Sequence, residues 1–256
     1  LHLDRQHVET ILQKDDPNNN RVKVVQSKMP KPYRLLALQK IRRLETIDSS
    51  FPEYTKLKEW VDGFVSIPFG VYTTLPISID NGISECEKYM MNAKTILDKT
   101  VYGLEDAKVQ ILQYISQLMI NPKSTGTCIA IKGPMGTGKT SLIKNGISKI
   151  LKRPFELIAL GGANDGSYFD GHSYTYSGSK CGEIVNILKR SKCMNPIIYF
   201  DELDKISATK GDEITNILMH ITDITQNTNF HDKYFDGNPS PPNNAFNALA
   251  LVVGGR

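Results

Sequence analysis

Apolar residues near the start of the chain recur at helical spacing in two runs. The first run comprises Leu35, Leu38, Ile41 and Leu44, and the second comprises Tyr54, Leu57, Trp60, Val61 and Phe64. Residues 49–52 (Ser-Ser-Phe-Pro) separate the runs, with a serine expected as helix cap and Pro52 in the first turn of the second helix. So short a connection predicts an antiparallel helical hairpin that ends by Pro68 and keeps its aromatic stripe in a core.

The flanks of this hairpin are weakly patterned. Before it, residues 8–12 are compatible with a short helix, residues 15–20 with a loop, and Pro30-Lys31-Pro32 with an extended chain. After it, residues 67–81 contain Pro and Gly and are typical of a linker.

From residue 84 onwards helical and strand patterns alternate. We expect helices at 84–97, 104–118, 140–151 and 183–189, and strands at 128–131, 155–160 and 196–200. Such alternation predicts an α/β fold, in which a parallel sheet is flanked by helices. Residues 161–182 form a long stretch rich in Gly, Ser, Asp and Tyr, and a loop of this length usually serves a function.

The composition limits the class of protein and the partners to be expected. The 256 residues are 40% hydrophobic and 23% charged, and the net charge is +4, which is ordinary for a globular protein. No apolar run reaches the roughly 20 residues of a membrane span, so no membrane partner is expected. The four cysteines show no metal-binding spacing, and we expect reduced thiols in an intracellular compartment, an organellar matrix included.

One stretch is strongly basic. Between Arg21 and Arg43 there are eight basic residues and no acidic one. Such a block can contact nucleic acid or an acidic partner, or it can simply form a solvated face. With few aromatic residues among the charges, the sequence favours the solvated face.

The segment Gly133–Thr140 (Gly-Pro-Met-Gly-Thr-Gly-Lys-Thr) lies between an expected strand and an expected helix, the setting of a phosphate-binding P-loop. Its glycines let backbone N–H groups surround phosphate oxygens at a helix N-terminus. Lys139 reaches the terminal phosphates, and the Thr140 hydroxyl is a ligand for Mg²⁺. The predicted ATP-binding residues here are Gly133, Pro134, Met135, Gly136, Thr137, Gly138, Lys139, Thr140 and Ser141.

Two consecutive acids, Asp201 and Glu202, end the third expected strand. The carboxyl ends of parallel strands meet at one edge of a sheet, so these acids are expected to face the P-loop. Asp201 would hold Mg²⁺ with Thr140, and Glu202 would activate water for attack on the γ-phosphate of ATP. We therefore expect Glu202 and Lys139 to be the catalytic residues of an ATP-hydrolysing P-loop NTPase.

These and further motifs resemble the AAA+ ATPase module of Lon-type proteases. The further motifs are Val101-Tyr102-Gly103-Leu104-Glu105, Leu160-Gly161-Gly162 with Gly171–Gly178, and Asn195-Pro196 through Lys205. The resemblance covers roughly residues 35–236. It implies that Tyr102 and Gly103 contact the adenine of ATP.

The resemblance also implies a role for Tyr176, which alone would be read as an exposed loop tyrosine. At this position the family carries a pore-loop aromatic residue that grips an unfolded polypeptide in a homohexameric ring, and a flat ring suits an extended chain of any sequence. The sequence departs from the family at Ser177 and Cys181, where Lon usually carries a bulky aliphatic residue and a proline.

Similarity is lost after residue 236. Residues 237–246 are a Pro- and Asn-rich insertion, and the strand expected at 248–253 ends in Gly254-Gly255, without the family's polar sensor residue. We expect four segments: a basic segment (1–34), a helical hairpin with linker (35–82), the AAA+ core (83–236) and a divergent tail (237–256). The sheet is expected to be incomplete towards the C-terminus, as in a truncated module without arginine finger or protease domain.

Three functions remain open on this evidence. The first is an ATP-hydrolysing module that moves polypeptides for proteolysis or quality control. The second is a structural or regulatory module that binds ATP and hydrolyses it little. The third is an AAA+ remodeller that acts on nucleic acid through the block Arg21–Arg43.

Overall fold

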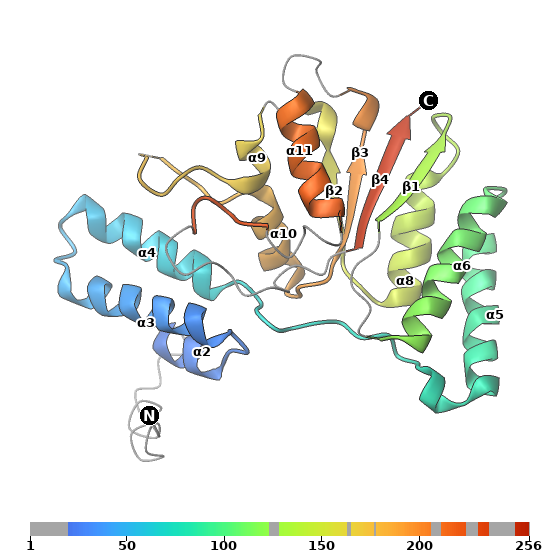
Figure 1. Cartoon of the computed structure of the whole chain (residues 1–256), viewed down its shortest axis with the longest axis horizontal. Coiled ribbons are helices and arrows are strands. Elements are labelled where there is room, and N and C mark those ends of the chain that lie inside the picture. Colours follow the sequence, from blue (N-terminus) through green and yellow to red (C-terminus); the bar gives the residue numbers. More distant parts are fainter. Residues whose placement is uncertain are drawn as a thin grey trace.

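The computed structural model describes most of the chain (Figure 1). The described residues are 20–122, 128–162, 165–176, 178–205, 211–223, 230–235 and 249–255. The helix expected at 8–12, the insertion at 237–246 and the departure at Ser177 lie outside these residues.

The described strands form one parallel sheet. They are β1 (Cys128–Gly133), β2 (Phe155–Ala159), β3 (Ile197–Asp201) and β4 (Leu249–Gly255), in the spatial order β1-β4-β3-β2. The expected strands are thus confirmed. Residues 249–255 lie in the expected divergent tail and form the strand between β1 and β3, as expected for 248–253, while the division of the chain into four segments stays a prediction. An unbroken apolar run is the pattern of a strand covered on both faces, which explains the central position.

Helices cover both faces of this sheet, and alternate residues of β3 pack against the helices on opposite faces. Its side chains alternate, so Ile197 and Tyr199 join one buried cluster and Ile198 and Phe200 join the other. The first cluster includes α5 (Ile83–Thr100) and α6 (Glu105–Ile120). The second includes α10 (Glu183–Ser191) and α11 (Gly211–Thr222). Helix α11 was not predicted, although Ile214, Leu218 and Ile221 are buried at helical spacing.

The helix expected after the P-loop is confirmed but is wound unevenly. It comprises α7 (Lys139–Ser141), a π-helical segment (Leu142–Ile147) and α8 (Ser148–Leu151). A π turn inside a helix is rare and often marks a functional site. Here it brings Gly146 so close to α5 that an added Cβ would lie 2.9 Å from Leu97 Cδ2. The glycine therefore permits close packing of the two helices.

The N-terminal helices are α2 (Asn20–Gln26), α3 (Lys31–Thr46) and α4 (Pro52–Val65). They confirm the hairpin, with three corrections. Helix α3 begins at Lys31, so Pro30–Pro32 is not wholly extended: Pro32 occupies the first turn, where its missing N–H is not needed. The expected boundary at residue 34 therefore falls inside α3. The residue before α4 is Phe51, with no side-chain cap, so a serine does not cap that helix.

Aromatic residues join these helices to the sheet-bearing part. Trp60 stacks on Phe64 with ring centroids 4.8 Å apart, and its Nε1 donates a hydrogen bond to the Tyr234 carbonyl oxygen at 3.1 Å. Phe235 packs edge-on against Trp60 at 5.5 Å. The aromatic stripe of α4 is therefore core, as predicted. Between α4 and α5 runs an irregular linker with a short 3-10 turn at Ile79–Asn81.

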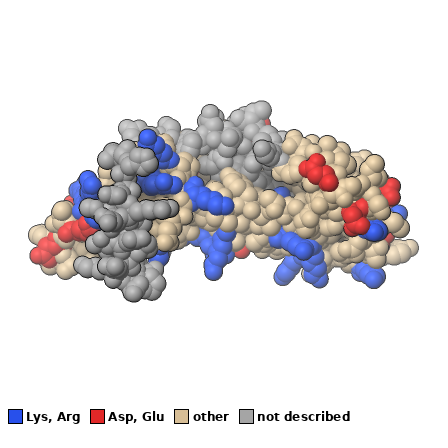
Figure 2. Space-filling view, turned by 90° about the horizontal axis from the view of Figure 1, so that it is seen from below, with Lys and Arg blue, Asp and Glu red and all other residues tan. Residues whose placement is uncertain are grey.

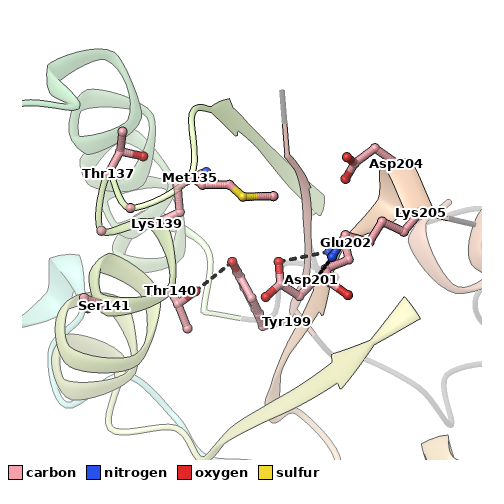
Figure 3. Close-up of a pocket in the computed structure, with 12 residues that line it drawn as sticks. Met135, Thr137, Lys139, Thr140, Ser141, Tyr199, Asp201, Glu202, Asp204 and Lys205 are labelled. Carbon is pink, nitrogen blue, oxygen red and sulfur yellow. Dashed lines mark hydrogen bonds and ion pairs between the residues drawn. The ribbon is translucent and has the colours of Figure 1, made fainter. Parts of the chain in front are cut away.

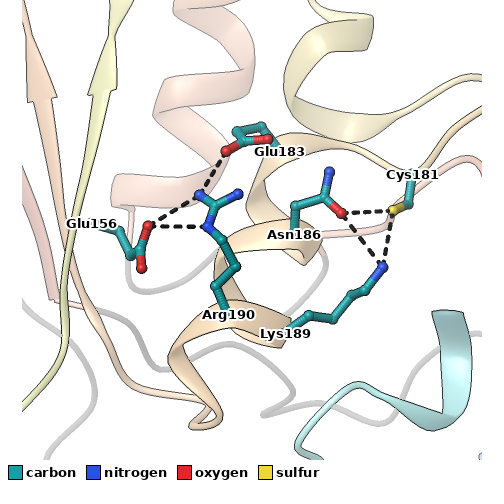
Figure 4. A network of polar contacts seen from close by, with 6 residues as sticks. All are labelled: Glu156, Cys181, Glu183, Asn186, Lys189 and Arg190. Atoms are coloured by element: carbon teal, nitrogen blue, oxygen red, sulfur yellow. Dashed lines mark hydrogen bonds and ion pairs between the residues drawn. The ribbon is translucent and has the colours of Figure 1, made fainter.

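An exposed ion-pair network ties α10 to the sheet (Figure 4). Arg190 binds Glu156 of β2 at 3.0 Å and Glu183 of its own helix at 2.8 Å. Because the Arg190 side chain is 51% exposed, each pair contributes at most about 1 kcal/mol to stability. On the other side of α10, Lys189 donates hydrogen bonds to Cys181 Sγ and Asn186 Oδ1.

Candidate functional site

The segment Gly133–Thr140 turns from β1 into α7. Gly136 and Gly138 adopt left-handed φ angles of 75° and 86°, which only glycine adopts without strain. At Gly138 an added Cβ would also lie 3.1 Å from both methyl groups of Val101. Glycine is therefore required at this position for its backbone and for its small size.

Lys139 points back into this turn. Its Nζ donates hydrogen bonds to the carbonyl oxygens of Gly133 at 2.6 Å and Pro134 at 2.7 Å. The side chain is largely buried, with 9% of the residue exposed. A positive charge is thus held inside the loop, where an anionic ligand is favoured.

The end of β3 faces the loop. Tyr199 and Asp201 lie two residues apart and so share one side of the strand. The Tyr199 hydroxyl is 3.0 Å from Thr140 Oγ1, which connects β3 directly to the P-loop. Burial raises the pKa of Tyr199, so this hydroxyl stays protonated near neutral pH.

Glu202 follows with an unusual backbone. Its φ of 61° is left-handed, a strained conformation for a residue with a side chain, and its N–H donates to Asp201 Oδ1 at 2.9 Å. The Glu202 carboxylate forms an ion pair with Lys205. Gly161 lies against this carboxylate, since an added Cβ there would be 2.8 Å from Glu202 Oε2.

Together these groups line a cavity of about 420 Å³ (Figure 3). This volume lies within the range of ligand sites, roughly 300–1,000 Å³. The lining residues are Met135, Gly136, Thr137, Gly138, Lys139, Thr140, Ser141, Tyr199, Asp201, Glu202, Asp204 and Lys205. The P-loop and the two acids predicted from sequence therefore meet at one cavity.

Three lining residues were not predicted to belong to the site. Tyr199 was detectable, because it precedes Asp201 by two residues in a strand and must share its side. Asp204 and Lys205 lie in a single 3-10 turn, Leu203–Lys205, which the sequence did not indicate. The ion pair of Lys205 with Glu202 depends on that turn.

Tyr102 and Gly103 do not line the cavity. The Tyr102 side chain is fully exposed, and it is the preceding Val101 that touches the P-loop at Gly138. Their contact with adenine stays a prediction.

The donor set at the cavity fits Mg²⁺. Thr140 supplies a hydroxyl and Asp201 a carboxylate, and Mg²⁺ prefers oxygen ligands and retains several waters beside substrate phosphates. Asp201 Oδ1 accepts the Glu202 N–H, whereas Asp201 Oδ2 accepts no hydrogen bond from the described residues. No group of three or more His, Cys, Asp or Glu that could hold a metal occurs in the described parts of the chain.

Tyr176 lies away from this cavity, on the loop that begins at Gly171. The residue is 67% exposed. The His172 N–H donates to the Lys180 carbonyl oxygen at 3.1 Å and closes the loop. At the base, the Gly182 N–H donates to Asp232 Oδ2 at 2.7 Å.

The buried carboxyl group of Asp232 is expected to make the free energy of unfolding depend on pH. Burial raises its pKa from 3.8 to about 7, the nearby Asp170 adds to this, and the N–H groups of Gly182 and Tyr234 act in the opposite direction. The folded state therefore binds more protons than the unfolded state between about pH 4 and 7. We expect the free energy of unfolding to fall as pH rises through this window, by up to about 4 kcal/mol.

Urea unfolding across this pH window tests the expectation. Asp232→Asn should flatten the pH dependence, whereas Asp212→Asn, at an exposed position of α11, should leave it unchanged. An unaltered slope in Asp232→Asn would contradict the assignment.

Comparison with known proteins agrees with this geometry. Residues 129–239 match the family model described as "ATPase family associated with various cellular activities (AAA)". Residues 129–239 belong to the AAA family. The P-loop, acids and parallel sheet of this chain are those of a P-loop NTPase with an α/β fold.

Around this AAA domain the similarity extends to Lon proteases. The chain is 34% identical over 226 residues to the Lon protease of Nitratidesulfovibrio vulgaris, which is 87% of this chain and 26% of the relative. It is 36% identical over 196 residues to the Lon protease homolog, mitochondrial 1, of Dictyostelium discoideum (77% and 19%). It is 32% identical over 211 residues to the Lon protease homolog of Acanthamoeba polyphaga mimivirus (81% and 20%).

These matches confirm the resemblance to Lon-type proteases that the motifs predict. The chain spans about a fifth to a quarter of the length of these curated relatives. None of the helices in the described residues combines the length and the apolarity that a membrane crossing requires.

Proposed function

We propose that the AAA domain binds ATP with Mg²⁺ at the P-loop cavity and hydrolyses it. The observation that carries the proposal is the meeting of Lys139 and Thr140 with Asp201 and Glu202 at one cavity. Lys139 and the loop N–H groups bind the phosphates, and Thr140 and Asp201 hold Mg²⁺. Mg²⁺ held there would supply positive charge that offsets the negative charge of the phosphates.

In this proposal two side chains, those of Lys139 and Glu202, change their partners when ATP binds. Lys139 Nζ gives up the carbonyl oxygens of Gly133 and Pro134 for phosphate oxygens, so its charge stays within the loop. Glu202 acts as general base towards a water molecule, for which its carboxylate leaves the ion pair with Lys205. A free carboxylate accepts the proton of that water during attack.

Binding and hydrolysis are separable by experiment. We expect the purified chain to bind a fluorescent ATP analogue more tightly with Mg²⁺ than with a chelator, and to release phosphate from ATP. Binding without phosphate release would instead favour the regulatory module. Two observations favour that second candidate: Lys205 neutralises Glu202, and β4 brings only Gly254 and Gly255 alongside Lys132 and Gly133.

The finer proposal is that hydrolysis drives movement of a polypeptide through a homohexameric ring. Tyr176 supports it, because an exposed aromatic residue on a loop closed at its base suits contact with an extended chain. The relatives are named proteases, which agrees with a polypeptide substrate.

Replacement of Tyr176 by alanine tests the polypeptide contact. We expect the affinity for an unstructured polypeptide to fall about tenfold, since aromatic residues dominate such contacts. ATP binding should stay unchanged, because Tyr176 does not line the cavity. Fluorescence anisotropy with a labelled unfolded protein measures the first quantity. Phe51→Ala removes another exposed aromatic ring as a control, and an equal loss in both variants would refute the role of Tyr176.

The nucleic-acid alternative finds less support. Within the block Arg21–Arg43, Arg21 forms an ion pair with Glu45, and Arg34 donates to the carbonyl oxygens of Ser27 and Met29. Seen from below, the described part of the surface carries Lys and Arg in separate groups and not in one continuous track (Figure 2). A track along one face is the usual electrostatic footprint of nucleic-acid binding.

A further inference from the structure

A second cavity lies between the helical hairpin and the Tyr176 loop. Its volume is about 280 Å³. Helix α3 contributes Lys40, Arg43 and Ile47, helix α4 contributes Glu53, Lys56 and Leu57, and the loop contributes Tyr174 and Thr175. No residue of the P-loop cavity takes part, so this cavity is separate from the nucleotide site.

Positive charge dominates this hairpin cavity. Its walls carry three cationic side chains and a single carboxylate, Glu53. In the described parts of the chain, none of Lys40, Arg43 and Lys56 forms an ion pair. Burial lowers the pKa of Lys40, and repulsion by the nearby Arg43 adds to this effect. An anion inside the cavity would relieve that repulsion.

Aromatic rings hold two of the cations in place. Lys56 Nζ lies 4.7 Å from the ring centroid of Tyr174, and Lys40 Nζ lies 5.5 Å from the same centroid and 5.3 Å from that of Trp60. Cation–π contacts of this kind stabilise an ammonium group without neutralising it. Both charges therefore remain available to a ligand while their positions are fixed.

The hairpin cavity is joined directly to the Tyr176 loop. Lys56 Nζ donates a hydrogen bond to the Tyr176 carbonyl oxygen at 3.0 Å. A chain that packs on the exposed Tyr176 ring therefore passes within side-chain reach of Lys56. This contact spans the helical hairpin and the loop, which are 120 positions apart in sequence.

Size and shape favour an amino-acid side chain as the ligand. The volume of 280 Å³ lies below the range of about 300–1,000 Å³ that drug-sized ligands occupy. The Tyr174 ring already packs against two ammonium groups and the Tyr234 ring, so it offers little free surface for a stacked base. A carboxylate needs only the converging positive charges.

We propose that the hairpin cavity binds the carboxylate side chains, Asp or Glu, of a polypeptide engaged at Tyr176. This inference rests on the proposed role of Tyr176 and gives that role a preference for acidic segments. Lys56 links the two contacts, while Arg43 and Lys40 supply the remaining charge. Binding of acidic segments then weakens as salt screens these partly exposed charges.

Peptide binding to the full chain tests the proposal. The probe is a labelled, unstructured peptide that contains Tyr and several Glu residues, and its counterpart carries Gln in place of each Glu. The variant Arg43→Gln/Lys56→Gln removes two charges from the cavity. The matched control Arg42→Gln/Lys58→Gln removes two exposed charges from the same helices, outside the cavity.

We expect the cavity variant to bind the Glu peptide about tenfold more weakly than the unmodified chain, as loss of charge-assisted contacts predicts. The control should change affinity less than twofold, and the Gln peptide should bind all three proteins alike. Equal losses of affinity in the cavity variant and the control variant would overturn the proposal. It would also be overturned if the cavity variant lost affinity for a single-stranded oligonucleotide and kept its affinity for the Glu peptide. If the unmodified chain binds both peptides equally, only the acidic preference fails. If it binds neither, the polypeptide role of Tyr176 fails as well.

Discussion

Replacing Lys139 by alanine is expected to weaken ATP binding about 100-fold. The ammonium group lies inside the P-loop and donates to two loop carbonyl oxygens, so it is positioned to donate equally to phosphate oxygens. Hydrogen bonds to a charged group contribute about 1.5–3 kcal/mol, and about 2.7 kcal/mol corresponds to two orders of magnitude in affinity. Titration with a fluorescent ATP analogue measures the loss directly.

Lys144→Ala provides the matched control for Lys139. Lys144 follows in the same helical segment but is exposed and does not line the cavity. We expect the affinity of the Lys144→Ala variant for ATP to stay within a factor of about two of that of the unmodified chain. Comparable losses in both variants would mean that the general positive charge, and not the P-loop lysine, attracts the nucleotide. The ATP site would then have to be sought elsewhere.

Glu202→Gln is expected to abolish most ATP hydrolysis and to leave ATP binding intact. Glutamine keeps the size of the side chain but cannot accept the proton of the attacking water. General-base catalysis contributes about 10²- to 10⁴-fold to a rate, so phosphate release should fall by a similar factor. Binding should persist because the phosphate contacts come from the P-loop.

The control for Glu202 is Glu87→Gln, at an exposed position of α5. It should leave both phosphate release and binding unchanged. Unchanged phosphate release in Glu202→Gln would remove the base from its proposed role. Combined with lost binding in Lys139→Ala, that result would identify the domain as a nucleotide-binding regulatory module.

Most of the nucleotide cavity could be predicted from sequence because its parts are local. The P-loop needs glycines at fixed positions between a strand and a helix, and Asp201-Glu202 ends an apolar strand. Parallel strands bring both to the same edge without further information. The hairpin was equally accessible, since its apolar spacing is regular.

Other features depend on contacts that spacing does not encode. Lys205 reaches Glu202 only because residues after β3 form a 3-10 turn, and Lys56 meets Tyr176 only through packing of the hairpin on the loop. The start of α3 was misjudged because Pro30 and Pro32 favour an extended chain locally, whereas Tyr33 and Leu36 bury with the core and extend the helix to Lys31. Tertiary burial outweighs local preference there.

The position of β4 has a consequence for the order of folding. Cys128 of β1 pairs with Ala250 of β4, and Ile197 of β3 pairs with Leu249 of β4. Strands β1 and β3 therefore gain their shared neighbour only when a segment much later in the sequence has been synthesised. Contacts of such long sequence separation slow folding. Until β4 is synthesised, β1 and the β3 side of the β2–β3 pair present unpaired edges, which are sites of non-native association. The central position of the described sheet is therefore filled only after both of its neighbours have been made.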